Sequence, residues 1–238
     1  MKSFILACFV LCQFTVIQAL EIQTATDHFQ LFAESHEAIT NDLLEEIEAS
    51  YFKNSVDFDF IPNEKIQINL FSDLTDFHQS IGWNNAPDWV VARTLVGVID
   101  IVSPQNPGPY HTEKSIKRIL LLNIAKSFIY QKYGSSCASF WFVFGVASNQ
   151  VDQTVIVQLP KVLPTLQQLE EADTKTFSKI GGFQIAHHLS AFIKQTYGWE
   201  KTLQLLASDD DFEAILGISK EDLYNKWVYS VEWLVSVV

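Results

Sequence analysis

The first half of the chain alternates between two spacings of apolar residues. Residues His28–Ala33 and Lys65–Phe71 alternate polar and apolar side chains, which predicts strands with one buried face. Glu37–Phe52 has apolar residues at helical spacing, and Ser72–Phe77 begins a short helix with good N-cap residues. The pattern therefore predicts strands followed by helices in this half.

The next elements lead into a long helix. Trp89–Val102 is rich in β-branched residues and predicts a strand, which ends at Ser103 and Pro104. A loop rich in proline and glycine, Gln105–Tyr110, then leads into a helix predicted over Thr112–Tyr133.

Every periodic segment after Pro164 has helical spacing. The predicted helices cover Phe183–Tyr197, Glu200–Leu206, Asp210–Leu216 and Ser219–Leu234. We therefore expect an α+β fold with a mixed α/β half over residues 20–150, an all-helical half over residues 151–238, and a groove between the halves.

The N-terminus has the features of a cleaved secretory signal over residues 1–19. Lys2 precedes an apolar stretch from Phe4 to Ile17, and Ala19 supplies a small residue at the cleavage position. A retained membrane anchor is the alternative, but the run is shorter than about 20 apolar residues and polar residues interrupt it. No later segment is long and apolar enough to span a bilayer. We expect a secreted or periplasmic protein.

Charge and cysteine content limit the classes of partner and chemistry that we expect. Acidic residues outnumber basic ones by 28 to 16, and no basic run could follow a phosphate backbone, so we expect no nucleic-acid partner. Cys8 and Cys12 lie in the predicted signal, which leaves Cys137 alone in the mature chain. Cys137 is either a small buried apolar residue, as its neighbours favour, or a reactive or intermolecular thiol.

Two apolar segments carry a resemblance to a known family. Ile116–Phe128, followed by Trp141–Ala147, resembles the motif helix and the next segment of peptidase MA-like domains, which are gluzincin-type metallopeptidases of the MA clan. In that family the helix carries His-Glu-x-x-His, and the later segment reads Trp-Leu-x-Glu-Gly-Leu-Ala. The resemblance implies a zincin-like fold and a motif helix that follows the sheet.

The remaining motifs of the family follow in the same order. They are a strand that ends in a proline-containing loop, a proline-led segment, a helix that ends in Tyr-Gly, and a closing pattern. Here these are Ile99–Pro104, Leu163–Glu170, Ala191–Gly198 and Leu216–Trp227. The resemblance thus covers almost the whole mature chain.

The chemical groups of the family are missing at the matching positions. The two metal-binding histidines correspond to Leu122 and Lys126, the general-base glutamate to Asn123, and the third-ligand glutamate to Phe144. Catalytic zinc needs three protein nitrogen, oxygen or sulfur donors, and leucine and phenylalanine have none. We therefore expect no bound metal, no cofactor and no catalytic residue at these positions, with Leu122 packed against Phe144 and Lys126 directed outward.

Other candidate residues carry less information. His187 and His188 are adjacent on a helix and point about 100° apart, so they cannot both bind one metal as an i,i+4 pair can. His111 precedes the motif helix and could reach the groove, although a loop histidine is more often a surface residue. Neither a nucleophile elbow nor a phosphate-binding loop is present.

The expected function is therefore that of a secreted pseudopeptidase, a zincin-like domain that binds an unidentified protein or peptide in its groove. The alternative is an active hydrolase with displaced catalytic residues, using zinc or a mechanism without metal. A purely structural exported domain is a third possibility.

Overall fold

The computed structural model describes residues 21–33, 39–151 and 158–236 of the 238-residue chain. The predicted signal, residues 1–19, lies outside the described residues. Five strands form one sheet in the order β1-β2-β3-β5-β4, with β1 at Glu21–Ala25, β2 at Phe29–Ala33, β3 at Ile66–Phe71, β4 at Ala92–Leu95 and β5 at Val98–Val102. Strands β2, β3 and β5 are parallel, and the edge strands β1 and β4 are antiparallel to their neighbours. The mixed sheet and its helices form an α+β fold.

Two of the predicted strands are confirmed, and one segment is corrected. His28–Ala33 and Lys65–Phe71 correspond to β2 and β3. The segment Trp89–Val102, expected as one strand, contains the hairpin of β4 and β5, whose two-residue turn is Val96 and Gly97. Gly97 has φ +72°, a backbone conformation that costs glycine little, so the chain reverses there.

Each face of the sheet has its own chemistry. Phe29, Ile68 and Ile101 point into the core, against the helices α1 (Asn41–Asp57) and α3 (Glu113–Tyr133). On the other face Asn69 Nδ2 donates to Asp100 Oδ1 at 2.7 Å, and Arg93 on the edge strand binds Asp100 Oδ2 through Nε at 3.0 Å. The alternation seen in the sequence therefore separates an apolar core face from a polar face.

The helices largely follow the sequence pattern. In the sheet half, α1 has Thr40 as its N-cap, α2 (Leu74–Ser80) has Asp73, and α3 has Thr112. The bounds of α3 agree with the long helix predicted over Thr112–Tyr133. The later helices are α4 (Phe140–Ser148), α5 (Leu166–Glu171), α6 (Thr174–Lys179), α7 (Gly182–Tyr197), α8 (Trp199–Ala207), α9 (Phe212–Leu216) and α10 (Lys220–Ser236). All four helices predicted after Pro164 are present, and the short helices α5 and α6 precede them.

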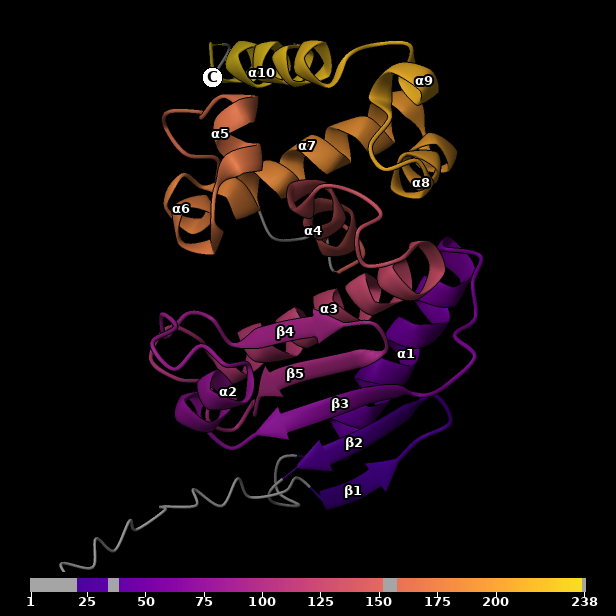
Figure 1. The fold of residues 1–238 in the computed structure, drawn as a ribbon, viewed down its shortest axis with the longest axis vertical. Helices are drawn as coiled ribbons and strands as arrows, with labels where there is room; N and C mark the ends of the chain where they lie inside the picture. The colour runs from indigo at the N-terminus through magenta and orange to yellow at the C-terminus, as the bar shows by residue number, and fades with distance from the viewer. Residues whose placement is uncertain (1–20, 34–38, 152–157, 237–238) are drawn as a thin grey trace, which may run out of the picture.

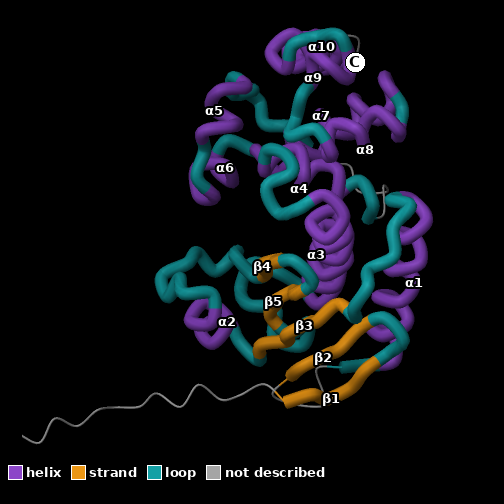
Figure 2. Tube along the Cα trace, turned by 45° about the vertical axis from the view of Figure 1, so that its right-hand side comes forward, coloured by secondary structure: helices purple, strands orange, loops and turns teal. Residues whose placement is uncertain are grey.

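Helix α3 lies between the sheet and the later helices, α4 to α10 (Figures 1 and 2). One side of α3 packs on β4, β5 and α1, and another packs on α4. Helix α4 packs most extensively on α7. It therefore belongs to the helical layer, although it precedes residue 151 in the sequence. Helix α4 thus joins α3 to α7.

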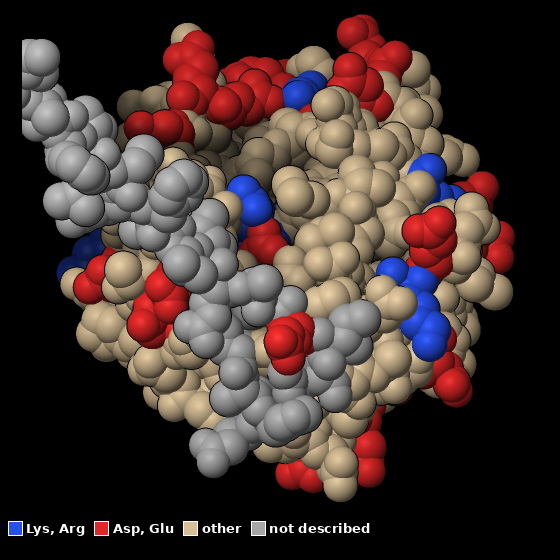
Figure 3. All heavy atoms as spheres, turned by 60° about the horizontal axis from the view of Figure 1, so that its bottom comes forward, with Lys and Arg blue, Asp and Glu red and all other residues tan. Residues whose placement is uncertain are grey.

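The surface reflects the acidic composition. The formal net charge is −12 at pH 7, and acidic side chains predominate on the face drawn in Figure 3. In the described residues, no helix is both long enough and apolar enough to cross a membrane.

Candidate functional site

The motif helix α3 is fixed at both ends by local sequence. Thr112 and Ser115 form a reciprocal capping box, in which Ser115 N donates to Thr112 Oγ1 at 3.2 Å and Thr112 N donates to Ser115 Oγ at 2.8 Å. The helix ends at Gly134, whose φ is +95°. One face of the helix is buried in the core, and a second face carries Ser115, Arg118, Ile119 and Leu122 at the spacing i, i+3, i+4, i+7.

Helices α4 and α7 approach each other closely at Gly145. A Cβ atom on Gly145 would lie 2.2 Å from the carbonyl oxygen of Ala186, so only glycine fits at this crossing. Asn149 also links the two helices. Its Nδ2 lies 2.8 Å from Gly145 O on α4, and 3.0 Å from His187 O and 2.7 Å from Ser190 Oγ on α7. The crossing fixes the faces of α4 and α7 that turn toward α3.

A cavity of about 340 Å³ opens where these three helices meet. Its apolar wall is formed by Ile119, Leu122, Phe144, Val151 and Phe183. Its polar wall is formed by His111, Ser115, Arg118, Ser148, Gln184 and His187. A concave site with an apolar wall and a few polar groups is typical of ligand-binding pockets, so this cavity is the candidate functional site.

Two of the four positions matched to the peptidase motif meet in this cavity. Leu122 from α3 and Phe144 from α4 both line it, although 22 positions separate them in sequence. The ring of Phe144 packs against Phe183 of α7 with a centroid distance of 4.8 Å. Hydrocarbon side chains therefore stand at two of the three positions at which the resemblance would place metal ligands, and Phe183 packs beside them.

The other two matched positions serve different contacts. Asn123 is 4% exposed, and its Oδ1 accepts a hydrogen bond from Thr94 on the edge strand β4. Its Nδ2 donates to the carbonyl oxygen of Ile119 at 2.6 Å. Both polar atoms of Asn123 are therefore engaged in joining α3 to the sheet.

Lys126 does not extend outward, and our expectation for this residue is wrong. The residue as a whole is partly exposed, but its amine lies deep in the protein, with Nζ 5.8 Å from the ring centroid of Tyr130. Burial lowers the pKa of the Lys126 amine from its ordinary 10.5 to about 8. The physical reason is that α3 is covered by the sheet and by α4, which leaves little of its surface to water.

These residues do not fit a catalytic zinc ion. Leu122 and Phe144 offer no donor atom, and the Lys126 amine must lose its proton before it can bind a metal. Nowhere in the described part of the chain do three or more His, Cys, Asp or Glu side chains gather as a metal site would require.

The electrostatics of the cavity come from basic groups. Burial lowers the pKa of His187, and the nearby His188 and Arg118 add to the effect, because a positive charge disfavours a second one. His187 Nδ1 lies 3.0 Å from Ser148 Oγ. Of the lining residues that the structure describes, none is a carboxylate.

Sequence reasoning missed most of the polar wall. His111, which the sequence placed either at the groove or on the surface, lines the cavity and binds the carbonyl oxygen of Trp89 through Nε2 at 3.0 Å. The position of Arg118 could have been predicted, because helical spacing places it on the same face of α3 as Ser115 and Leu122. Ser148, Gln184 and His187 carry no such signal, since only the packing of α4 and α7 brings them to α3.

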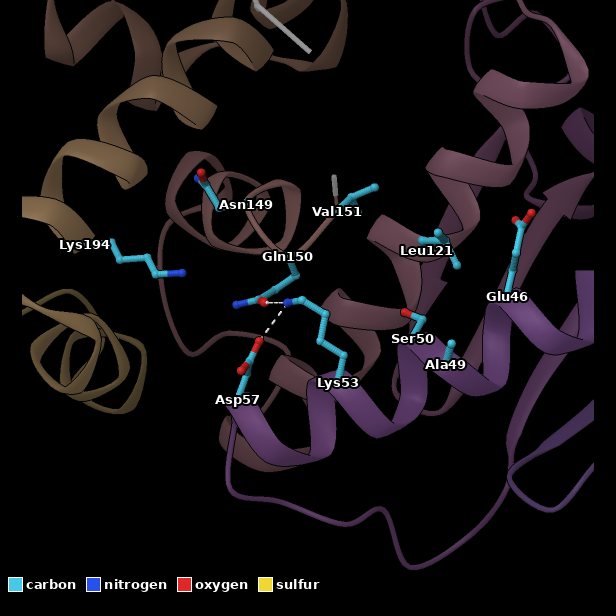
Figure 4. A pocket seen from close by; sticks show the side chains of 10 residues that line it. All are labelled: Glu46, Ala49, Ser50, Lys53, Asp57, Leu121, Asn149, Gln150, Val151 and Lys194. Carbon is cyan, nitrogen blue, oxygen red and sulfur yellow. Dashed lines mark hydrogen bonds and ion pairs between the residues drawn. The ribbon is translucent and has the colours of Figure 1, made fainter. Parts of the chain in front are cut away.

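A second, larger cavity of about 750 Å³ opens on another side of α3 and α4 (Figure 4). It lies between α1, α3 and α7, and it contains both acids and amines, including Glu46, Asp57, Lys53 and Lys194. Lys53 binds Asp57 at 2.7 Å and also donates to Gln150 (Figure 4). Because its charges are of both signs and partly paired, it is a weaker candidate than the cavity at Leu122.

Cys137 is a buried residue, as its neighbours predict. It is 7% exposed, and burial raises the pKa of its thiol to about 11. It lines neither of the two cavities. A nucleophilic role would require a thiolate, which this environment disfavours.

Comparison with known proteins gives no relative: neither a family model, a curated protein nor a solved structure matches this chain.

Proposed function

We propose that this protein is a secreted pseudopeptidase with a zincin-like, peptidase MA-like fold, which binds a protein or peptide in the groove between α3, α4 and α7. The observation that carries the proposal is the meeting of Leu122 and Phe144 in one cavity. These residues occupy two of the three ligand positions in the resemblance, and neither can hold a metal ion.

The surroundings support the same proposal. Strand β5 ends at Val102 and leads through a loop containing Pro104 into α3, in the order that the resemblance requires. Asn123, at the position of the general base, is used to join α3 to β4. A carboxamide cannot accept a proton from water as a glutamate would, so the position has a structural role.

Zinc binding and peptide cleavage test the proposal directly. We expect the purified protein, supplied with zinc and then dialysed, to retain far less than one zinc per chain. We also expect no chelator-sensitive cleavage, that is, no cleavage of casein or of a peptide library that is inhibited by orthophenanthroline. Stoichiometric zinc together with chelator-sensitive cleavage would refute the proposal.

Restoring the missing ligands tests the alignment itself. A triple variant, Leu122→His, Lys126→His and Phe144→Glu, should bind about one zinc per chain, since it supplies two nitrogen donors and one oxygen donor. The matched control carries Leu121→His, Lys126→His and Phe144→Glu. Its first histidine faces the second cavity, because Leu121 lines that cavity. If the folded triple variant, checked by circular dichroism, binds zinc no better than this control, the alignment is wrong.

An active hydrolase without metal is the second candidate, and the contact between Ser148 and His187 favours it. Two features weigh against it. Ser148 Oγ also donates to the carbonyl oxygen of Gly145 at 2.8 Å, and no carboxylate in the described lining orients the imidazole. Any hydrolysis of activated esters that Ser148→Ala abolishes, without loss of folding, would establish this candidate instead.

A further inference from the structure

The cavity at Leu122 has a charge opposite in sign to the protein as a whole. The chain has a formal net charge of −12, yet the ionisable side chains described around this cavity are Arg118, His111 and His187. A concave site lined by one sign of charge attracts ligands of the other sign. The ligand of this cavity is therefore expected to be an anion.

Arg118 supplies a donor that its own protein does not use. The sequence contains two arginines, and Arg93 binds Asp100. In contrast, Arg118 forms no ion pair with any described residue, and its Nε is buried without an acceptor. A buried donor without a partner destabilises the folded chain, and a carboxylate ligand that pairs with the guanidinium would remove that cost.

The same cavity offers an unused acceptor and an apolar wall. Gln184 Oε1 is buried, and within the described residues it receives no hydrogen bond. Leu122, Phe144 and Phe183 form a surface on which an apolar side chain can pack. A ligand that fits all three features has a carboxylate, an N–H donor and an apolar group within a small volume.

We propose that this cavity binds the C-terminal residue of a peptide or protein. The terminal carboxylate binds the Arg118 guanidinium, and an apolar side chain packs on Leu122 and Phe144. The Gln184 side chain turns toward the ligand, so that its Oε1 accepts from the amide N–H of the last residue. A fatty acid also carries a carboxylate and an apolar group, but it has no N–H donor for Gln184. The inference rests on the proposed function and names the ligand class of the same groove.

Binding of short synthetic peptides tests this assignment. The probes are N-acetylated, fluorescently labelled pentapeptides that end in Phe or Leu, each as the free acid and as the C-terminal amide, with decanoate as a competitor. Fluorescence anisotropy gives the dissociation constants. We expect the free acids to bind at least tenfold more tightly than the amides, because the amides lack the charge that Arg118 recognises.

Three variants locate the site. Arg118→Gln should weaken the free acids at least tenfold and leave the amides unchanged, whereas Arg118→Lys should retain part of the preference. Lys194→Gln is the matched control, because it removes a positive charge on α7 that lines the second cavity. Lys194→Gln should bind as the unchanged protein does, and all three variants should keep their melting temperatures within a few degrees.

Several outcomes would overturn the inference. These are equal binding of acids and amides, a preference that Arg118→Gln does not reduce, tighter binding of decanoate than of the peptide acids, or no binding of any acid at millimolar peptide. The failure of the pseudopeptidase proposal looks different, because it requires zinc-dependent cleavage. A protein that shows neither cleavage nor acid preference refutes only the ligand assignment.

Discussion

Thr94 on the edge strand β4 donates a hydrogen bond to Asn123 on α3, and both side chains are buried. The orientation of the Asn123 amide is fixed by its second contact, because Nδ2 faces the carbonyl oxygen of Ile119, which can only accept. Asn123 therefore connects α3 to the sheet.

This contact predicts a measurable stability effect. Thr94→Val keeps the shape of the side chain but leaves Asn123 Oδ1 buried without a donor, so it should lower the free energy of unfolding by about 1–3 kcal/mol. Denaturant unfolding of Thr94→Val, Asn123→Ala and the double variant should give a coupling energy of about 0.5–3 kcal/mol. Additive effects of the two substitutions would show that the hydrogen bond contributes nothing.

The buried amine of Lys126 predicts an unusual dependence of stability on pH. Its pKa is about 8 in the folded chain and 10.5 ordinarily, so between these values the unfolded chain binds more protons. The free energy of unfolding should therefore rise as pH increases from 8 to 10.5. Below pH 8 the buried charge should cost about 1–3 kcal/mol.

Lys126→Met separates this effect from other titrations. The variant should be more stable than the unchanged protein at pH 7, and its stability should change less between pH 8 and 10.5. Thermal unfolding at several pH values measures both. A melting temperature of Lys126→Met below that of the unchanged protein at pH 7 would argue against a buried charge.

Ligand binding should also depend on pH through His187. Its pKa is lowered by burial, by His188 and by Arg118, and α4 contributes only the uncharged Ser148. His111 and Arg118 are the other ionisable groups described around the cavity. A bound carboxylate should raise the pKa of His187, so binding takes up a proton and tightens as pH falls from about 7.5 to about 5.5.

His187→Gln is expected to flatten this profile, while the ligand carboxylate, with a pKa of about 3.5, stays ionised throughout. The dissociation constants of the peptide acids at each pH give the result. His28→Gln serves as the comparison, because His28 is bound to Glu48 and does not line the cavity. An unchanged pH profile in His187→Gln would exclude this residue from binding.

The crossing of α4 and α7 predicts that Gly145 tolerates no side chain. Gly145→Ala places a Cβ 2.2 Å from the carbonyl oxygen of Ala186 and 2.6 Å from Ser190 Oγ. The helices must separate, which should cost about 3 kcal/mol or more. Adding Ser190→Ala removes the hydroxyl but not the carbonyl, so the double variant should not regain stability. Native-like unfolding of Gly145→Ala would contradict the close crossing.

Cys137 predicts slow thiol chemistry. Because its pKa is raised to about 11 and its side chain is buried, the thiolate is scarce and shielded at pH 8. Iodoacetamide should modify the folded protein at least roughly tenfold more slowly than the protein unfolded in guanidinium chloride. Mass spectrometry measures the modified fraction. Equal rates in the two conditions would restore the alternative of a reactive thiol.

Sequence pattern determined most of the elements of this protein. Alternation in His28–Ala33 and Lys65–Phe71 predicted two core strands, and helical spacing predicted the motif helix and the helices after Pro164. These elements follow from local chemistry, since each buries one face and is ended by a cap or a turn. The hairpin of β4 and β5 was missed because Gly97 is the only turn-forming residue in a segment that is otherwise rich in β-branched residues.

The tertiary structure alone decided the site. The sequence identifies Leu122 and Phe144 as residues without metal donors, but only the packing of α3, α4 and α7 brings them into one cavity. It also decided that Lys126 is buried and that Arg118, Gln184 and His187 share that cavity. The physical reason is that the direction of a side chain follows from its own helix, whereas its neighbours depend on which faces of other helices pack against it.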